Sequence, residues 1–208
     1  MPDRFPRIKI CGLRDAATVR LVAKAGADAI GFVFYAPSPR NIDVEPAKAL
    51  LAAVPAFVTT VGLFVNADAD WLRQTLRELP LDLLQFHGDE SPEYCRSFGR
   101  PYIKAVRVKP GTNLLEYAAL YHDARGLLVD AFVEGTPGGT GEAFDWSLIP
   151  ADLPLPLILS GGLHAGNVAE AIAAVKPWAV DVSSGVEASR GIKDHGKIVQ
   201  FIKAARSA

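Results

Sequence analysis

Short apolar runs and helical patterns alternate along the chain. The apolar runs are nearly continuous, as expected of parallel strands covered on both faces, and they occupy residues 8–11, 29–34, 57–65, 81–86, 102–108, 126–129, 155–159 and 178–182. Helical spacing of apolar residues, with Gly26 placed to end the first helix, predicts helices over residues 16–25, 46–54, 71–79, 92–98, 114–121, 145–148, 168–175 and 197–205.

The repeat of strand and helix predicts the fold class. Eight units in 208 residues leave 26 residues for each, without a low-complexity segment or an inter-domain linker. This order favours a single α/β domain over residues 1–208, built as a closed (β/α)8 barrel, or TIM barrel. A doubly wound open sheet is the structural alternative.

Composition excludes several classes of function. The 22 Lys and Arg residues balance 23 Asp and Glu residues, which leaves no basic surplus for nucleic acid. No apolar stretch is long enough for a membrane span or a signal peptide. The two cysteines, Cys11 and Cys95, make no disulfide framework, and the four histidines are scattered rather than spaced as metal ligands. We therefore expect a cytoplasmic protein with no nucleic-acid or membrane partner and no metal.

Polar residues gather where the predicted strands end. In a barrel these ends and the following loops form the active face. The candidate residues there are Cys11, Arg40, His87, Arg107, Asp130 and Asp181. Each also has a structural interpretation: Cys11 as a small buried apolar residue, Asp130 as the ion-pair partner of Arg107, His87 as a turn residue, Arg40 as a surface residue. Asp181 could bind a substrate hydroxyl or simply order the face, and we interpret Cys95 as structural.

Glycines after the last two predicted strands indicate a phosphate site. Gly161 and Gly162 follow the seventh strand, and Ser184 and Gly185 follow the eighth, which is the usual phosphate position in such barrels. The alternative is that these glycines only make tight turns. The Gly-rich stretch 137–141 is longer than a bare connection needs and could cover a substrate. The residues alone thus indicate a cofactor-free enzyme that handles a small phosphorylated metabolite by acid–base chemistry.

Eight motifs in order carry a resemblance to one family. They are residues 9–13 (KICGL), 26–34 (GADAIGFVF), 38–40 (SPR), 85–88 (QFHG), 129–130 (VD), 138–146 with its GGTG and FDW, 159–163 (LSGGL) and 181–187 (DVSSGVE). Together they resemble phosphoribosylanthranilate isomerase, an enzyme of tryptophan biosynthesis. The resemblance runs from about residue 8 to about residue 200, and it departs at Glu142, Ala143 and Arg190.

The resemblance implies a phosphate-binding barrel and an Amadori rearrangement without metal or cofactor. Carried over by position, it implies that Cys11 is the general base, that Asp130 is the general acid and that Arg40 binds the anthranilate carboxylate. It implies phosphate contacts at Gly141, Gly161, Gly162, Ser184 and Gly185. His87, Arg107 and Asp181 are expected to contact substrate, in roles that the sequence does not define.

Two other classes of function stay open at this stage. A related phosphate-binding barrel enzyme, such as indoleglycerol-phosphate synthase or the histidine-pathway aminoaldose isomerase, would share the fold, although the latter family uses a pair of aspartates and position 11 is a cysteine. A catalytically silent barrel that binds a phosphorylated metabolite is the non-enzyme alternative. The assembly could be a monomer or a homodimer.

Overall fold

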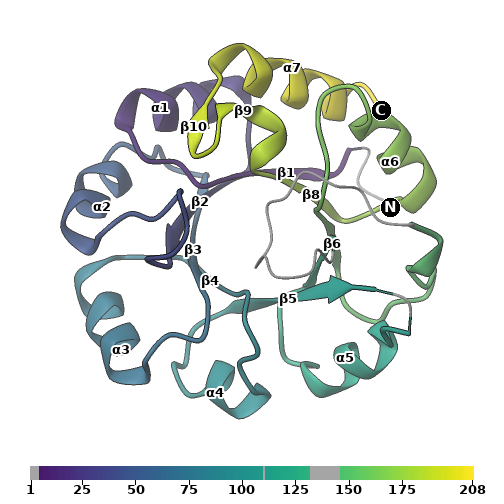
Figure 1. Ribbon diagram of the computed structural model, residues 1–208, viewed down its shortest axis with the longest axis horizontal. Coiled ribbons are helices and arrows are strands. Elements are labelled where there is room, and N and C mark those ends of the chain that lie inside the picture. The colour runs from purple at the N-terminus through teal and green to yellow at the C-terminus, as the bar shows by residue number, and fades with distance from the viewer. Residues whose placement is uncertain (1–4, 110, 132–145) are drawn as a thin grey trace.

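The chain folds into a closed parallel barrel surrounded by helices (Figure 1). The computed structural model describes residues 5–109, 111–131 and 146–208. The barrel strands are β1 (Arg7–Cys11), β2 (Ala29–Phe34), β3 (Thr59–Phe64), β4 (Leu83–Phe86), β5 (Tyr102–Val108), β6 (Leu127–Ala131), β7 (Leu157–Leu159) and β8 (Ala179–Val182). The predicted barrel is confirmed, and the open-sheet alternative is wrong.

Helices follow most strands in the predicted order. They are α1 (Ala16–Ala25), α2 (Val44–Leu51), α3 (Ala69–Glu78), α4 (Pro92–Arg96), α5 (Leu114–Leu120), α6 (Val168–Val175) and α7 (His195–Arg206), with the short 3-10 turns η1 (Trp146–Leu148) and η2 (Ser184–Val186). Asp15 caps the start of α1 by accepting from the backbone N–H of Thr18 at 2.8 Å, and Gly26 ends that helix at φ +97°, as predicted.

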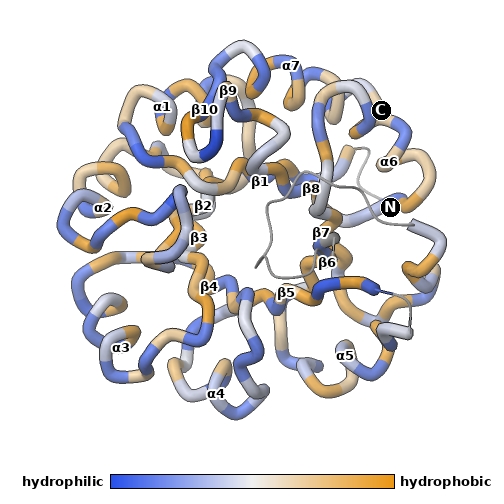
Figure 2. Tube along the Cα trace, in the orientation of Figure 1, coloured by the Kyte–Doolittle hydropathy of each residue, from blue (hydrophilic) through white to orange (hydrophobic). Residues whose placement is uncertain are grey.

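The two faces of the strands have different neighbours. Residues that point outward pack with the helices into one large core, and Figure 2 shows the strand ring as mostly hydrophobic. The residues that point inward build a small apolar floor of Ile103, Ala105, Leu128, Ile158 and Ala179. Side chains alternate along a strand, so the residue two positions after a floor residue also faces inward. On β5, β6 and β8 these residues are Arg107, Asp130 and Asp181, and directly after β7 the residue is Ser160. The barrel interior therefore changes from apolar to polar toward the ends of the strands.

Strands β1 and β8 close the barrel. Their parallel register pairs Lys9 with Asp181, one position before Val182 pairs with Ile10. Closure brings the first motif of the sequence next to the last one.

One element was absent from the sequence prediction. After β8 and η2, the strands β9 (Glu187–Ser189) and β10 (Ile192–Lys193) form an antiparallel hairpin outside the barrel sheet. Strands of three and two residues are too short to show an alternating pattern. The signal that was available is the two-residue turn Arg190-Gly191, because a glycine in a short turn is typical of hairpins.

Several predicted boundaries also differ from the structure by one to three residues, and two helix starts show a physical reason. Helix α2 begins at Val44 rather than at residue 46, since Asp43 already adopts the extended conformation of a helix cap. The last helix begins at His195 rather than at residue 197, behind the cap Asp194. Within the described residues, no helix is both long and apolar enough to cross a membrane.

Candidate active site

A cavity of about 340 Å³ opens where the barrel strands end. Strands far apart in the chain contribute to its wall, because they lie side by side in the ring that Figure 1 shows. The predicted site residues that line it are Cys11, Arg40, His87, Asp130, Gly161, Gly162, Asp181 and Ser184. The structure thus brings the thiol of Cys11 and the carboxyl of Asp130 to one cavity, although 119 positions separate them in the chain.

Two predicted residues lie outside this lining, and a third lies outside the described residues. Arg107 donates from Nη2 to the carbonyl of His87 at 3.5 Å and is not among the lining residues. Gly185 is also not among them. A Cβ there would collide with the carbonyl oxygen of Leu163, so close packing between two loops requires this glycine. Gly141 lies in the segment that the structure does not describe.

The environment of Cys11 is buried and contains a cation. Cys11 is 3% exposed, and it faces Gly31 in the register of β1 and β2. A Cβ on Gly31 would lie 2.7 Å from Sγ of Cys11, so the glycine provides the space that the thiol occupies. Lys9, two residues earlier on the same inward face, forms a buried ion pair with Asp181 at 2.8 Å.

Burial and charge act in opposite directions on the Cys11 thiol. Burial raises the pKa of Cys11, the Lys9 ammonium lowers it, and the Asp181 carboxylate raises it again, with a net rise above the ordinary value. The pKa of Lys9 is also raised: burial alone would lower it, but Asp181 and Cys11 outweigh that effect. Catalysis through a thiolate requires electropositive help, which Lys9 supplies, although the effect of burial on the pKa of Cys11 is larger.

Asp130 contacts a histidine held by a glutamine. Nε2 of His87 lies 3.3 Å from Oδ2 of Asp130, and Nδ1 of His87 forms a 2.8 Å hydrogen bond with the side-chain amide of Gln85. All three side chains are buried. The alternative partner, Arg107, is the register neighbour of Asp130 across β5 and β6, but its side chain reaches the His87 carbonyl instead. Nε2 of His87 has no hydrogen-bond partner among the described residues, so its 3.3 Å approach to Asp130 is a close contact from which a small shift would make a hydrogen bond to the carboxyl.

Arg40 is buried at the rim of the cavity and is joined to Glu187. Nε donates to Oε1 at 2.7 Å and Nη2 donates to Oε2 at 3.0 Å. Lys193 adds a third contact, from Nζ to Oε1 of Glu187 at 2.9 Å. Sequence reasoning assigned no role to Glu187 or Lys193, because both belong to the hairpin that it did not predict.

Gly161 and Gly162 have backbone conformations that suit an anion loop. Both have positive φ angles, +83° and +65°, which non-glycine residues rarely adopt. The Asn167 side chain donates to the carbonyl of Gly162 at 3.0 Å and fixes its direction. With Ser184 on the neighbouring loop, this wall can offer backbone N–H groups to a phosphate.

The second buried cysteine, Cys95, lies outside the lining of the cavity. Cys95 packs in α4 with no exposed surface, and burial raises the pKa of its thiol to about 12, which agrees with a structural role. In the part of the chain that the structure describes, no three His, Cys, Asp or Glu side chains converge as metal ligands would.

Comparison with known proteins places this chain in a family. The sequence model of N-(5'phosphoribosyl)anthranilate (PRA) isomerase matches residues 8–204. N-(5'-phosphoribosyl)anthranilate isomerase of Pseudomonas putida (strain KT2440) is 59% identical over 202 residues, which cover 97% of this chain and 98% of the relative.

Two solved structures show the same fold. Phosphoribosyl anthranilate isomerase in complex with reduced 1-(o-carboxyphenylamino)-1-deoxyribulose 5-phosphate superposes with a TM-score of 0.85 at 40% identity, over 98% of this chain and 100% of that chain. A Thermotoga maritima structure, described as monomers generated from the dimeric enzyme, gives a TM-score of 0.84 at 39% identity, over 98% of this chain and all of the other.

Proposed function

Because the chain belongs to the N-(5'-phosphoribosyl)anthranilate isomerase family, which acts in tryptophan biosynthesis, we propose that it isomerises its aminoaldose substrate with Cys11 as general base and Asp130 as general acid. The proposal needs no cofactor. The observation that carries it is the single cavity lined by Cys11, Asp130 and Arg40, with the paired glycines Gly161 and Gly162 in its wall.

The first step opens the sugar ring. Asp130 donates a proton to the ring oxygen, the bond between that oxygen and C1 breaks, and the nitrogen lone pair forms a protonated Schiff base. His87, 3.3 Å from the carboxyl, orients Asp130 for this transfer. Arg107 supports His87 through the backbone contact described above.

The second step moves a proton from carbon. The Schiff-base cation acidifies the C–H bond at C2, and Cys11 removes this proton as a thiolate, which gives an enolamine. The Cys11 thiol then returns a proton to C1 while the C2 hydroxyl gives its proton to the Asp130 carboxylate, which yields the aminoketose and restores both groups. Lys9 is the main cation that favours the thiolate, and Lys193 adds a smaller effect in the same direction. Asp181 holds Lys9 and lies in the cavity wall, where it can also contact a sugar hydroxyl.

The two ends of the substrate carry anionic groups, and the cavity offers a matching partner for each. We assign the carboxylate to Arg40, because a guanidinium matches a planar carboxylate. We assign the phosphate to the loops at Gly161, Gly162, Ser184 and Gly185, with Gly141 from the segment outside the described residues. The description of the relative bound to a carboxyphenylamino ribulose phosphate supports a ligand of this class. Anchoring at both ends would hold the sugar between acid and base.

The test is turnover of the aminoaldose by the purified protein. We expect loss of the anthranilate fluorescence of the substrate, with activity unaffected by dialysis against a chelator. Conversion of the histidine-pathway aminoaldose instead would favour the related barrel enzyme, and no turnover of either would favour a silent binding protein.

The Thermotoga relative is described as a dimer from which monomers were generated, so the proposal covers a monomer or a homodimer, which sedimentation distinguishes.

A further inference from the structure

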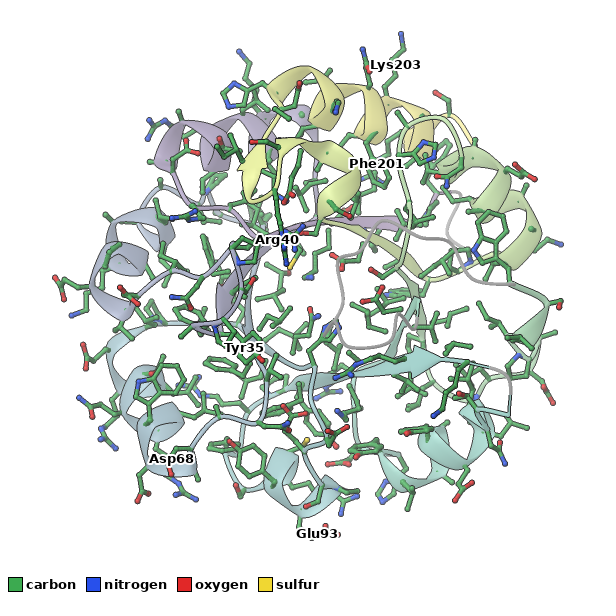
Figure 3. The ribbon with its side chains drawn as sticks, viewed as in Figure 1. Tyr35, Arg40, Asp68, Glu93, Phe201 and Lys203 are labelled. Atoms are coloured by element: carbon green, nitrogen blue, oxygen red, sulfur yellow. The ribbon has the colours of Figure 1, made fainter. Side chains whose placement is uncertain are left out.

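Glu187 occupies two of the three guanidinium nitrogens of Arg40. The Nε and Nη2 contacts, 2.7 and 3.0 Å, make a bidentate pair, and the side chains are only 10% and 4% exposed. Nη1 of Arg40 has no hydrogen-bond partner among the residues that the structure describes, while Arg40 lines the cavity at the barrel mouth (Figure 3). Because Nε and Nη2 share one edge of the planar group, Glu187 fixes which edge remains for another ligand.

The carboxylate of Glu187 is itself fixed by four donors. Oε1 accepts from Arg40 and from Nζ of Lys193 at 2.9 Å, and Oε2 accepts from Arg40 and from the backbone N–H of Gly191 at 3.0 Å. Burial alone would raise the pKa of Glu187, but Arg40 and Lys193 hold it below the ordinary value. Glu187 is therefore held in place beside Arg40 by contacts that favour its carboxylate form.

The hairpin β9–β10 packs against the loop that carries Arg40 without spare room. Gly191, at φ +82°, faces Pro39 so closely that a Cβ would lie 2.6 Å from the Pro39 carbonyl oxygen. On the other side, a Cβ on Gly12 would lie 2.8 Å from Cδ of Arg40. Both the backbone before Arg40 and its side chain are thus confined between two glycines.

The charges of this cluster do not cancel. Arg40 and Lys193 are two cations around one carboxylate, so their formal sum is +1. Glu187 alone would neutralise Arg40 and weaken it as a partner for an anion. With Lys193 on the same oxygen, Glu187 can orient Arg40 while the cluster keeps one net positive charge for an incoming carboxylate.

We propose that Glu187 is a positioning residue that turns the open edge of Arg40 toward the substrate carboxylate, and that this makes the β9–β10 hairpin a determinant of specificity for carboxylate-bearing substrates. The proposal rests on the proposed function, in which Arg40 binds that carboxylate. Glu187 touches no reacting atom, and its effect passes through Arg40.

The test compares two substrates that differ only in the carboxylate. Glu187→Gln is assayed with N-(5-phosphoribosyl)anthranilate and with N-(5-phosphoribosyl)aniline, which lacks it. For the first substrate we expect KM to rise about tenfold with kcat within about twofold, and for the second we expect kcat/KM within about twofold of the wild type. Equal changes for both substrates, or no change for either, would overturn the proposal.

Glu90→Gln is the matched control. Glu90 is a second buried glutamate, paired with Lys104 at 3.0 Å, and it does not contact Arg40. Replacement of Glu90 should change kcat/KM for both substrates by the same factor. If Glu187→Gln does not fold, Glu187→Asp retains the charge but shortens the side chain, and it should still reduce discrimination between the two substrates.

A double variant separates this proposal from the proposed function. In an Arg40→Ala background, Glu187→Gln should cause no further loss of discrimination, and a further loss would contradict an effect through Arg40. If Arg40→Ala alone leaves the KM for the anthranilate substrate unchanged, the assignment of Arg40 to the carboxylate is wrong, whatever Glu187 does.

Discussion

Lys9 and Asp181 face each other across the seam that closes the barrel, and their side chains form a buried ion pair of 2.8 Å beside Cys11. The pair has two roles in our interpretation. It stabilises the closed barrel, and it holds an ammonium group near the thiol.

Replacement of Lys9 by methionine should affect both roles. A buried carboxylate without its partner typically costs roughly 3–5 kcal/mol in the free energy of unfolding. Without the ammonium, the pKa of Cys11 should rise further, so the thiol should react more slowly with iodoacetamide near pH 8. The measurement uses a Cys95→Ala background, in which Cys11 is the only cysteine.

Lys9→Met/Asp181→Asn is the control for stability, since it removes both charges. We expect it to recover much of the free energy of unfolding that Lys9→Met loses. An unchanged alkylation rate in Lys9→Met would show that Lys9 does not act on the thiol.

Removal of either proposed acid–base group should abolish most turnover and leave the fold intact. We expect Cys11→Ala and Asp130→Asn each to lower kcat by about a hundred- to ten-thousand-fold. Both changes keep or reduce side-chain volume, so circular dichroism and thermal unfolding should remain close to the wild type. Near-wild-type kcat in either variant would remove that residue from the mechanism.

The pH dependence of kcat/KM should reflect the raised pKa of Cys11. The thiolate is the active form of the base, and kcat/KM reports groups of the free enzyme. A pKa above the ordinary value of about 8.5 means that the thiolate fraction still increases at that pH. We therefore expect kcat/KM to rise through pH 8.5 in a steady-state profile.

Cys95→Ala should leave that profile unchanged, because Cys95 lies in α4 away from the cavity. A plateau below pH 8 in the wild type would mean that the free enzyme already holds Cys11 as a thiolate.

Gly31 should be intolerant of even one methyl group. In Gly31→Ala the new Cβ would lie 2.7 Å from Sγ and 3.1 Å from Cα of Cys11, so thiol and strand must shift. A displacement of about 1 Å at a reacting group can cost on the order of a hundredfold in rate, and we expect kcat to fall by about ten- to a hundredfold.

Gly196→Ala is the control for this substitution. Gly196 is exposed in α7, and a Cβ there meets only the side chain of Asp194, at 3.2 Å. It should retain activity. Wild-type kcat in Gly31→Ala would show that the position of the thiol is not critical.

The sequence was sufficient to predict the fold and to place most of the candidate site residues at one cavity, because both depend on local patterns. Nearly continuous apolar runs predicted the strands, and residues at the strand ends necessarily share one face of a barrel. The pair Gly161 and Gly162 was a readable signal because glycine adopts without strain the positive φ angles that both residues have in the structure.

Contacts between distant segments could not be predicted in the same way. Arg40 and Glu187 are separated by 147 positions, and nothing local to either residue indicates the other. The hairpin of Glu187 was missed because its strands are too short for a pattern. The net change in the pKa of Cys11 depends on burial and Asp181, which raise it, against the cations Lys9 and Lys193, which lower it, and only the assembled barrel brings these groups together.

Closure of the ring between β1 and β8 joins residues 172 positions apart, Lys9 and Asp181. A polypeptide that has folded only its first several strands would already contain Cys11, Arg40 and His87, yet it would lack the anion that holds Lys9 and the hairpin that holds Arg40. Catalytic activity should therefore return late in refolding, as one of the last observable events. The time course of its return would report when the barrel closes.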